Sequence, residues 1–166
     1  MMGLLSSLFA RGEPVLSEAA SRDAAAIAAL HAASFRRGWS EQEVEGLLTD
    51  RHVIAHRAMI GSKMTGSTMA GFIMSRLVED EAEILSVAVA RPRRGRGLAR
   101  NLLNLHLRRL AAFGARAVFL EVDEHNKAAI RLYDRAGFHE ISRRPNYYPG
   151  AGGKAVAALV LRRDLV

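Results

Sequence analysis

The chain has 166 residues, of which 49% are apolar and 25% are charged, and it contains no cysteine. Such a composition predicts one globular domain with a sizeable core, and the missing thiols exclude disulfides, thiolate catalysis and thiolate metal sites. The net charge of +7 is unevenly spread: residues 1–90 hold 8 basic and 11 acidic side chains, and residues 91–166 hold 16 and 6. The basic part suits a polyanionic ligand, and the acidic part suits a cationic partner.

No apolar stretch approaches the roughly 20 residues that a membrane-spanning helix needs. The first residues also lack the basic start of a signal peptide. We therefore expect a flexible tail over 1–12, one domain over 13–166, no membrane contact and a cytoplasmic location.

The first half of the chain mixes helical and extended patterns. A short strand is expected over 14–19, followed by a helix that Ser21 or Asp23 caps. Ser40 and Glu43 form a capping box for a second helix. Three strands are expected next, over 51–59, 69–78 and 82–90, and they predict an antiparallel meander.

The second half alternates helices and strands. A leucine-rich helix is expected over 98–113, ending at Gly114. The apolar run 117–122 is typical of a strand buried on both faces and parallel to the strand before the helix. The remaining expected elements are a helix over 127–136 capped by Asn126 and ended by Gly137, a strand through Ile141, an aromatic loop over 144–149, and a last strand over 155–161. Together these elements predict a mixed α/β single domain with antiparallel N-terminal strands.

The stretch 85–100 joins a strand, a turn and a helix start. Pro92 ends the strand, and Gly95 and Gly97 open the helix. Glycines allow the backbone to approach a ligand closely, and the first N–H groups of a helix can bind an anion. Five arginines belong to this stretch: Arg91, Arg93, Arg94, Arg96 and Arg100. We therefore expect a site for a phosphate-bearing ligand here.

Several other chemistries are set aside. Arg100 stands where a dinucleotide-binding motif has its third glycine, and Gly153-Lys154 lacks the upstream glycine and the hydroxyl of a P-loop. No Gly-x-Ser-x-Gly motif is present. His52 and His56 could share one face of a strand, but no third ligand stands nearby, so no metal site is predicted.

A set of motifs in a fixed order remains. Arg94-Gly95-Arg96-Gly97-Leu98-Ala99 fits the pattern Gln/Arg-x-x-Gly-x-Gly/Ala. The motifs that follow are Leu120-Glu121-Val122, Asn126, Ala128-Ala129-Ile130, Leu132-Tyr133 and Ala136-Gly137-Phe138. Over residues 82–165 this order resembles the GNAT superfamily of acetyl-CoA-dependent N-acetyltransferases. Arg143-Arg144-x-Asn146-Tyr147-Tyr148-Pro149 is similar in particular to ribosomal-protein alanine N-acetyltransferases, whereas before residue 82 the likeness is limited mainly to Phe35 and Trp39-Ser40-Glu41.

The resemblance implies a GNAT fold, with a parallel pair of strands splayed around acetyl-CoA as co-substrate and with no metal. It implies that Glu121 is the general base and Tyr133 the general acid. The implied cofactor contacts are the backbones of Val87, Ala88 and Val89 for the acetyl and pantetheine part, Arg94, Gly95, Arg96, Gly97, Leu98, Ala99 and Arg100 around the pyrophosphate, and Asn126 on the pantetheine arm. For the acceptor we expect contacts from Trp39, Tyr147 and Tyr148.

Each of these residues also has a purely structural interpretation. Glu121 could end a strand and face water, Tyr133 could pack in the core, and Asn126 could only cap its helix. Trp39 could plug the junction of two helices, and the two tyrosines could be packing aromatics. Arg91 and Arg93 receive no role.

The function that the resemblance implies is transfer of acetyl to the α-amine of a protein N-terminus, in particular the alanine of a small-subunit ribosomal protein. An α-amine, with a pKa of about 7.7–8, loses its proton more readily than a lysine, with a pKa of about 10.4. The acidic turn 79–83 and the glutamates of 41–45 could bind a basic peptide, and no DNA partner is expected. The alternatives are a lysine or small-molecule amine acetyltransferase of the same fold and an RNA- or ribosome-binding module. The oligomeric state is left open.

Overall fold

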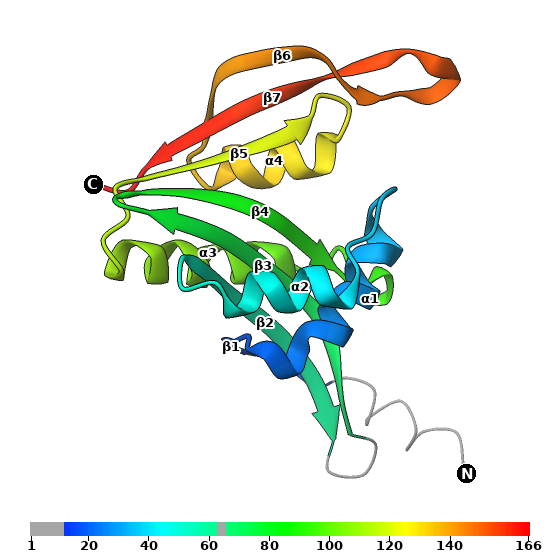
Figure 1. Ribbon diagram of the computed structural model, residues 1–166, viewed down its shortest axis with the longest axis vertical. Coiled ribbons are helices and arrows are strands. Elements are labelled where there is room, and N and C mark those ends of the chain that lie inside the picture. Colours follow the sequence, from blue (N-terminus) through cyan, green and yellow to red (C-terminus); the bar gives the residue numbers. More distant parts are fainter. Residues whose placement is uncertain (1–11, 63–65) are drawn as a thin grey trace.

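A seven-stranded mixed sheet runs through the molecule in the order β1-β2-β3-β4-β5-β7-β6 (Figure 1). The computed structural model describes residues 12–62 and 66–166, so nearly all of the tail expected over 1–12 lies outside the described residues. The strands are β1 (Val15–Glu18), β2 (Val53–Ser62), β3 (Gly66–Val78), β4 (Glu81–Val89), β5 (Ala117–Asp123), β6 (His139–Pro149) and β7 (Ala155–Asp164). The helices are α1 (Ala24–Ser34), α2 (Glu41–Thr49), α3 (Leu98–Ala112) and α4 (Lys127–Arg135), with 3-10 turns η1 (Ser21–Asp23), η2 (Arg91–Arg93) and η3 (Ala151–Gly153).

The predicted mixed α/β fold is confirmed. Strands β2, β3 and β4 form the expected antiparallel meander, and β1 adds to its edge. Strands β4 and β5 are parallel, as expected of strands joined through a helix. None of the helices within the described ranges is long and apolar enough to cross a membrane.

The parallel pair is short and then parts. Only Glu81–Glu83 of β4 pair with Ala117–Phe119 of β5. Beyond Phe119 the partner of β5 is β7 alone, with Glu121 opposite Val160. The molecule therefore has two halves, β1–β4 with α1–α3 and β5–β7 with α4, joined where the two strands still pair (Figure 1).

The sheet is covered on both faces in its first half. The leucine face of α3, with Leu102, Leu103 and Leu110 fully buried, packs on one face, and α1 and α2 cover the other around Phe72. Strand β5 differs from its prediction. Val118, Leu120 and Val122 are buried, but the opposite face of this strand, formed by Phe119, Glu121 and Asp123, is only half-buried. This open face leaves a carboxylate accessible beside the point where the strands part.

The helix boundaries follow the predicted capping signals. Ser40 Oγ accepts the Glu43 N–H and the Glu43 carboxylate accepts the Ser40 N–H, which is the expected capping box. Gly114 and Gly137 have φ of 98° and 86°, as C-terminal glycines do. Asp23 stands at the N-cap position of α1 but makes no side-chain cap there; its carboxylate instead accepts the Ala20 N–H and pairs with Arg57.

The prediction of an aromatic loop over 144–149 is wrong, because strand β6 continues to Pro149. Strand β6 is the edge of the sheet, where proline is tolerated since one side of the strand makes no ladder hydrogen bonds. The pairing with β7 is interrupted between Arg144 and Tyr148, where three residues of β6 oppose one of β7. Asn146 in this bulge has a φ of 57°.

Candidate active site

A cavity of about 650 Å3 opens between the end of β4, the turn before α3 and helix α4. Residues 87–89, residues 93–100 and one face of α4 line it, including Arg131, Tyr133 and Arg135. We call it the arginine-lined cavity. Its volume is within the range of about 300–1,000 Å3 that is usual for small-molecule sites.

The end of β4 presents free backbone groups to this cavity. The Ala90 N–H donates to the Ala70 carbonyl of β3, and hydrogen-bonded pairs alternate along an antiparallel ladder. Ala88 is therefore bonded to β3, whereas the N–H groups of Val87 and Val89 point away from β3, toward the space that β5 has left. The expected contact of these backbones with the acetyl and pantetheine part stays a prediction; of the three, Val87 and Val89 have N–H groups that are free for it, and Ala88 also lines the cavity.

The turn before α3 has the geometry of an anion site. Gly95 and Gly97 have φ of 76° and 79°, a conformation that favours glycine. Gly97 is the N-cap of α3 and its carbonyl accepts the Asn101 N–H, so the N–H groups of Leu98, Ala99 and Arg100 have no partner within the helix. Residues 95–100 line the cavity, as predicted for residues that wrap a pyrophosphate.

Arg94 has a local contact in addition to its place on the cavity wall. Its Nε donates to the Val89 carbonyl at 2.9 Å, so the side chain ties the turn to the end of β4. This bond occupies the Val89 carbonyl and leaves the Val89 N–H facing the cavity. Arg94 therefore shapes the site as well as adding charge to it.

Six arginines surround the cavity: Arg93, Arg94, Arg96, Arg100, Arg131 and Arg135. Acetyl-CoA carries a pyrophosphate and a further phosphate, and guanidinium groups bind phosphates well. The cradle of positive-φ glycines, the free helix N–H groups and this charge fit that molecule. Arg131 and Arg135 were not among the predicted contacts; their spacing of four residues on α4, which places them on one helix face, was the available signal.

Tyr133 lies on the wall of the same cavity, on α4. It is buried, with 8% of its surface exposed, and its ring meets Phe138 edge-on at 5.6 Å. Burial raises the pKa of Tyr133 to about 12. The hydroxyl is therefore protonated at neutral pH and can donate its hydrogen into the cavity. The core-packing and catalytic interpretations of this residue are compatible.

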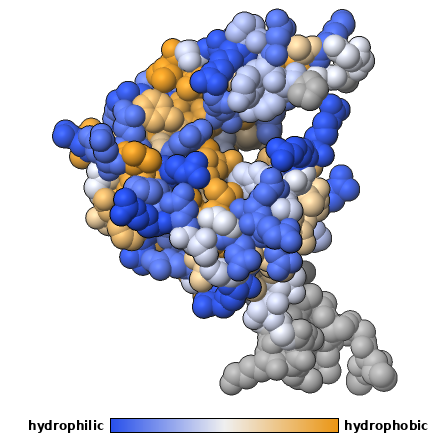
Figure 2. Space-filling view, viewed as in Figure 1, coloured by the Kyte–Doolittle hydropathy of each residue, from blue (hydrophilic) through white to orange (hydrophobic). Residues whose placement is uncertain are grey.

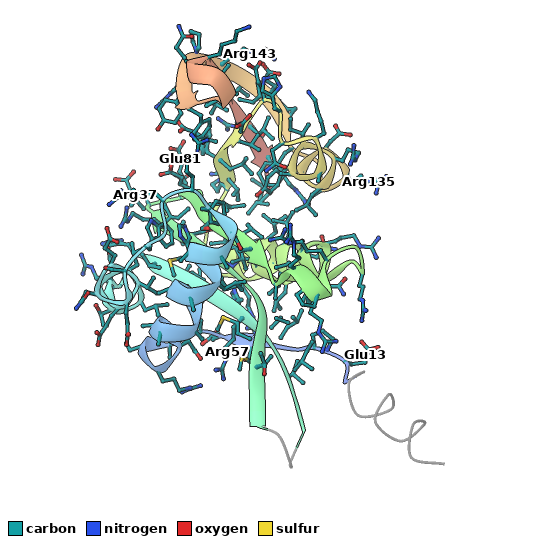
Figure 3. All side chains as sticks on the ribbon, turned by 90° about the vertical axis from the view of Figure 1, so that its right-hand side faces the viewer. Glu13, Arg37, Arg57, Glu81, Arg135 and Arg143 are labelled. Carbon is teal, nitrogen blue, oxygen red and sulfur yellow. The ribbon has the colours of Figure 1, made fainter. Side chains whose placement is uncertain are left out.

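A second hollow, of about 630 Å3, lies on the other side of the parting strands. It is lined by Arg76, residues 78–83, residues 119–121, Arg144 and Val160, and we call it the acidic groove. Figure 3 shows Glu81, which lines the groove, and Arg135, which lines the arginine-lined cavity, on opposite sides of the molecule. In space-filling form the molecule is hollowed between its two halves (Figure 2).

Glu121 lines the acidic groove and has 22% of its side chain exposed. Its Oε1 lies 3.0 Å from Nη1 of Arg144 on β6. Burial raises the pKa of Tyr148, and the negative charge of Glu121 adds to this increase. Arg144 belongs to a motif noted in the sequence, but its pairing with Glu121 joins residues of different strands and had no sequence signal.

Two predicted contacts lie elsewhere. Trp39 stacks on His31 at 4.0 Å and packs beside the core under α1 and α2, and it lines neither hollow. The structure thus favours the plug at the helix junction over the binding-site wall. Asn126 caps α4 through Ala129, at 3.2 Å, and is absent from the lining of the arginine-lined cavity. Its contact with a pantetheine arm stays a prediction.

Tyr147 and Tyr148 stand together on β6, with their rings 5.0 Å apart and nearly perpendicular. Tyr147 is 48% exposed and Tyr148 is half-buried. The guanidinium of Arg144 lies 5.6 Å from the centre of the Tyr147 ring. Tyr147 therefore adjoins the Glu121–Arg144 pair, but neither tyrosine lines the acidic groove, and their contact with an acceptor stays a prediction.

Residues 24–138 match the family model described as the acetyltransferase (GNAT) family. This chain belongs to the GNAT family. It is 36% identical over 123 residues to the [ribosomal protein bS18]-alanine N-acetyltransferase of Salmonella typhimurium, a match that covers 74% of this chain and 78% of that protein. The enzyme of that name from Escherichia coli K12 is 38% identical over 92 residues, which is 55% of this chain and 62% of that one.

A solved structure agrees with these sequence matches. The crystal structure of the ribosomal-protein-S18-alanine N-acetyltransferase from Escherichia coli superposes with a TM-score of 0.82 at 28% identity, covering 92% of this chain and 94% of the other. The GNAT fold thus extends over both halves of the molecule, including the part of the first half before residue 82 that the structure describes, where the sequence motifs are few.

Proposed function

We propose that this GNAT protein transfers the acetyl group of acetyl-CoA to the α-amine of a protein N-terminus, in particular the N-terminal alanine of a small-subunit ribosomal protein in the cytoplasm. One observation carries the proposal. The parting of β4 and β5 leaves the N–H groups of Val87 and Val89 free between a cavity suited to a polyphosphate and a groove that holds a carboxylate.

The arginine-lined cavity holds acetyl-CoA, and the acidic groove holds the acceptor. Bound acetyl-CoA supplies an acetyl group activated as a thioester. The acceptor enters from the acidic groove, where Glu121 removes a proton from its amine. The free N–H groups at the end of β4 donate to the thioester oxygen as negative charge develops on it. Tyr133, on the opposite wall, donates the proton that the departing sulfur needs.

The charges of the two hollows support the assignment of the ligands. The six arginines hold the phosphates, and the acidic groove holds the acceptor chain. Residues 79–83 give the groove four carboxylates, at Glu79, Asp80, Glu81 and Glu83, which attract a basic peptide over distances of about a Debye length. A basic ribosomal protein would fit this side, and the homologues named above are ribosomal protein bS18-alanine N-acetyltransferases.

Steady-state rates with three acceptors test the proposal. The first is a basic peptide that starts with alanine and has no lysine, the second is the same peptide with a blocked α-amine and one added lysine, and the third is a small primary amine. The proposal predicts turnover of the first alone. Turnover of the second or third at a comparable kcat/KM would instead show a lysine or small-amine acetyltransferase. Tight RNA binding with no acetyl-CoA-dependent turnover of any acceptor would favour a binding module.

A further inference from the structure

Arg144 occupies the place on Glu121 that an acceptor amine needs. Its Nη1 lies 3.0 Å from Glu121 Oε1, and both side chains line the acidic groove. A protonated acceptor amine is a cation and would bind to the same carboxylate, because Glu121 supplies the negative charge at this point of the groove. Arginine stays charged in proteins and cannot act as the proton donor in place of an amine. While the ion pair is formed, the guanidinium offsets the charge of this carboxylate and repels an incoming ammonium group.

Arg144 makes a second contact at the same time as this ion pair. Its guanidinium lies 5.6 Å from the centre of the Tyr147 ring, and a cation over an aromatic face is attracted by it. The Arg144 side chain is 60% exposed, so little packing holds it on the carboxylate. A partly exposed ion pair is weak, and a cation–aromatic contact is of similar strength. Moving Arg144 from Glu121 fully onto Tyr147 therefore requires little free energy.

The backbone allows this movement of the side chain without a change of the sheet. Arg144 pairs with Ala158 of β7 and is the last paired residue before the bulge of residues 145–147. Asn146 turns the chain there with a φ of 57°, and Tyr148 resumes the pairing opposite Val156. Arg144 is thus anchored through its backbone, while its partner Tyr147 stands on the unpaired segment.

We propose that Arg144 competes with the acceptor for Glu121: it holds the carboxylate in the acceptor-free protein and yields it to the incoming α-ammonium group by moving to Tyr147. Arg144 is then a positioning residue that favours acceptors with a cationic group strong enough to displace it. The inference rests on the proposed function, because it assigns Glu121 to the acceptor side of the reaction.

The chain offers a matched control in Arg143. This neighbouring arginine has a similar exposure, 51%, and also pairs with carboxylates, but with Glu124 and Glu140, each at 3.2 Å. Figure 3 places Arg143 at the outer end of the β5–β7 half, away from Glu81 of the acidic groove. Replacing Arg143 removes the same charge from β6 without freeing Glu121.

The test measures peptide binding by calorimetry in the presence of CoA, for an alanine-starting peptide that has a free α-amine and no basic side chain, and for the same peptide N-acetylated. Arg144→Ala should lower the Kd of the free-amine peptide about two- to fivefold, because a surface ion pair of about that strength no longer competes with the amine. The Kd of the blocked peptide should stay unchanged. Arg144→Gln should behave like Arg144→Ala, while Arg144→Lys, which keeps a cation, and Arg143→Ala should bind both peptides as the wild type does.

An unchanged or higher Kd of the free-amine peptide in Arg144→Ala would overturn the competition, as would an equal change in Arg143→Ala. Failure of the proposed function is distinguishable from these results: there the wild-type protein itself would not acetylate the free-amine peptide.

Discussion

The imidazoles of His56 on β2 and His106 on α3 meet at 2.7 Å, Nδ1 to Nδ1, inside the core. Nε2 of His106 lies 2.7 Å from Ser75 Oγ, and all three side chains are almost completely buried. Only one hydrogen fits between two Nδ1 atoms at this distance, so the two rings cannot both be charged. Burial lowers the pKa of His106 to about 3, and His56 contributes to the decrease. Burial also lowers the pKa of His56. The negative charge of Glu18 opposes this decrease, and the positive charge of Arg109 adds to it.

Stability should therefore fall as the pH falls. The unfolded chain takes up protons at these histidines near pH 6.5, whereas the folded chain does not until far lower pH. For His106 alone, the free energy of unfolding should decrease by about 1 kcal/mol between pH 6.5 and 5.5. Urea unfolding at the two pH values measures it. His106→Gln should lose this part of the pH dependence, while the exposed His125→Gln should keep it; equal pH dependence in His106→Gln and the wild type would contradict the account.

Tyr133→Phe should lower kcat by about 100-fold and leave the KM for acetyl-CoA nearly unchanged. Phenylalanine keeps the ring that packs on Phe138 but removes the hydroxyl that protonates the leaving sulfur. Because the pKa of Tyr133 is raised to about 12, loss of its proton should also cause no fall in kcat of the wild type up to about pH 10. Steady-state kinetics of the wild type and of Tyr133→Phe measure both effects, and near-normal turnover of Tyr133→Phe would refute the role.

Glu121→Gln should lower kcat/KM for the acceptor and flatten the acidic limb of its pH profile, since an amide cannot accept the proton of the amine. The control is Glu140→Gln, which removes a carboxylate of the same half that bonds to Arg143 rather than to Arg144. The measurement is kcat/KM between pH 5 and 9. A limb that persists unchanged in Glu121→Gln would point to another base or to titration of the amine itself.

Reversing the charge of Glu79, Asp80 and Glu81 to lysine should raise the KM for a basic peptide at low salt. The carboxylates of the acidic groove attract the peptide through solvent, so the effect should fade as the ionic strength increases. The KM for a peptide without basic residues should hardly change and serves as the control. An unchanged KM for the basic peptide at low salt would remove the groove from acceptor recognition.

The local features of the fold follow well from the sequence. The strand, turn and helix over 85–100 depend on Pro92 and two glycines, and the start of α2 depends on Ser40 and Glu43 three residues apart, so neighbouring residues suffice. The parallel arrangement of β4 and β5 follows from the intervening helix. For the same reason the cofactor side of the candidate site, which is built on that turn, was largely predictable.

Features that depend on distant residues were not predictable. Two prolines, Pro145 and Pro149, indicate a loop unless the segment is known to be an edge strand. The place of β6 at the edge depends on the order of all seven strands. The contacts of His56 with His106 and of Glu121 with Arg144 join residues 50 and 23 positions apart, and no local pattern marks them. The acceptor side is built from such contacts, and its residues were accordingly the least well placed.

The most direct test of the central claim is the position of the acetyl group on a peptide that offers both kinds of amine. A basic alanine-starting peptide with one internal lysine is incubated with acetyl-CoA and the protein, and fragment mass spectra locate the label. The account predicts a single acetyl group on the α-amine of the alanine. A label on the lysine, or no label at all, would contradict it.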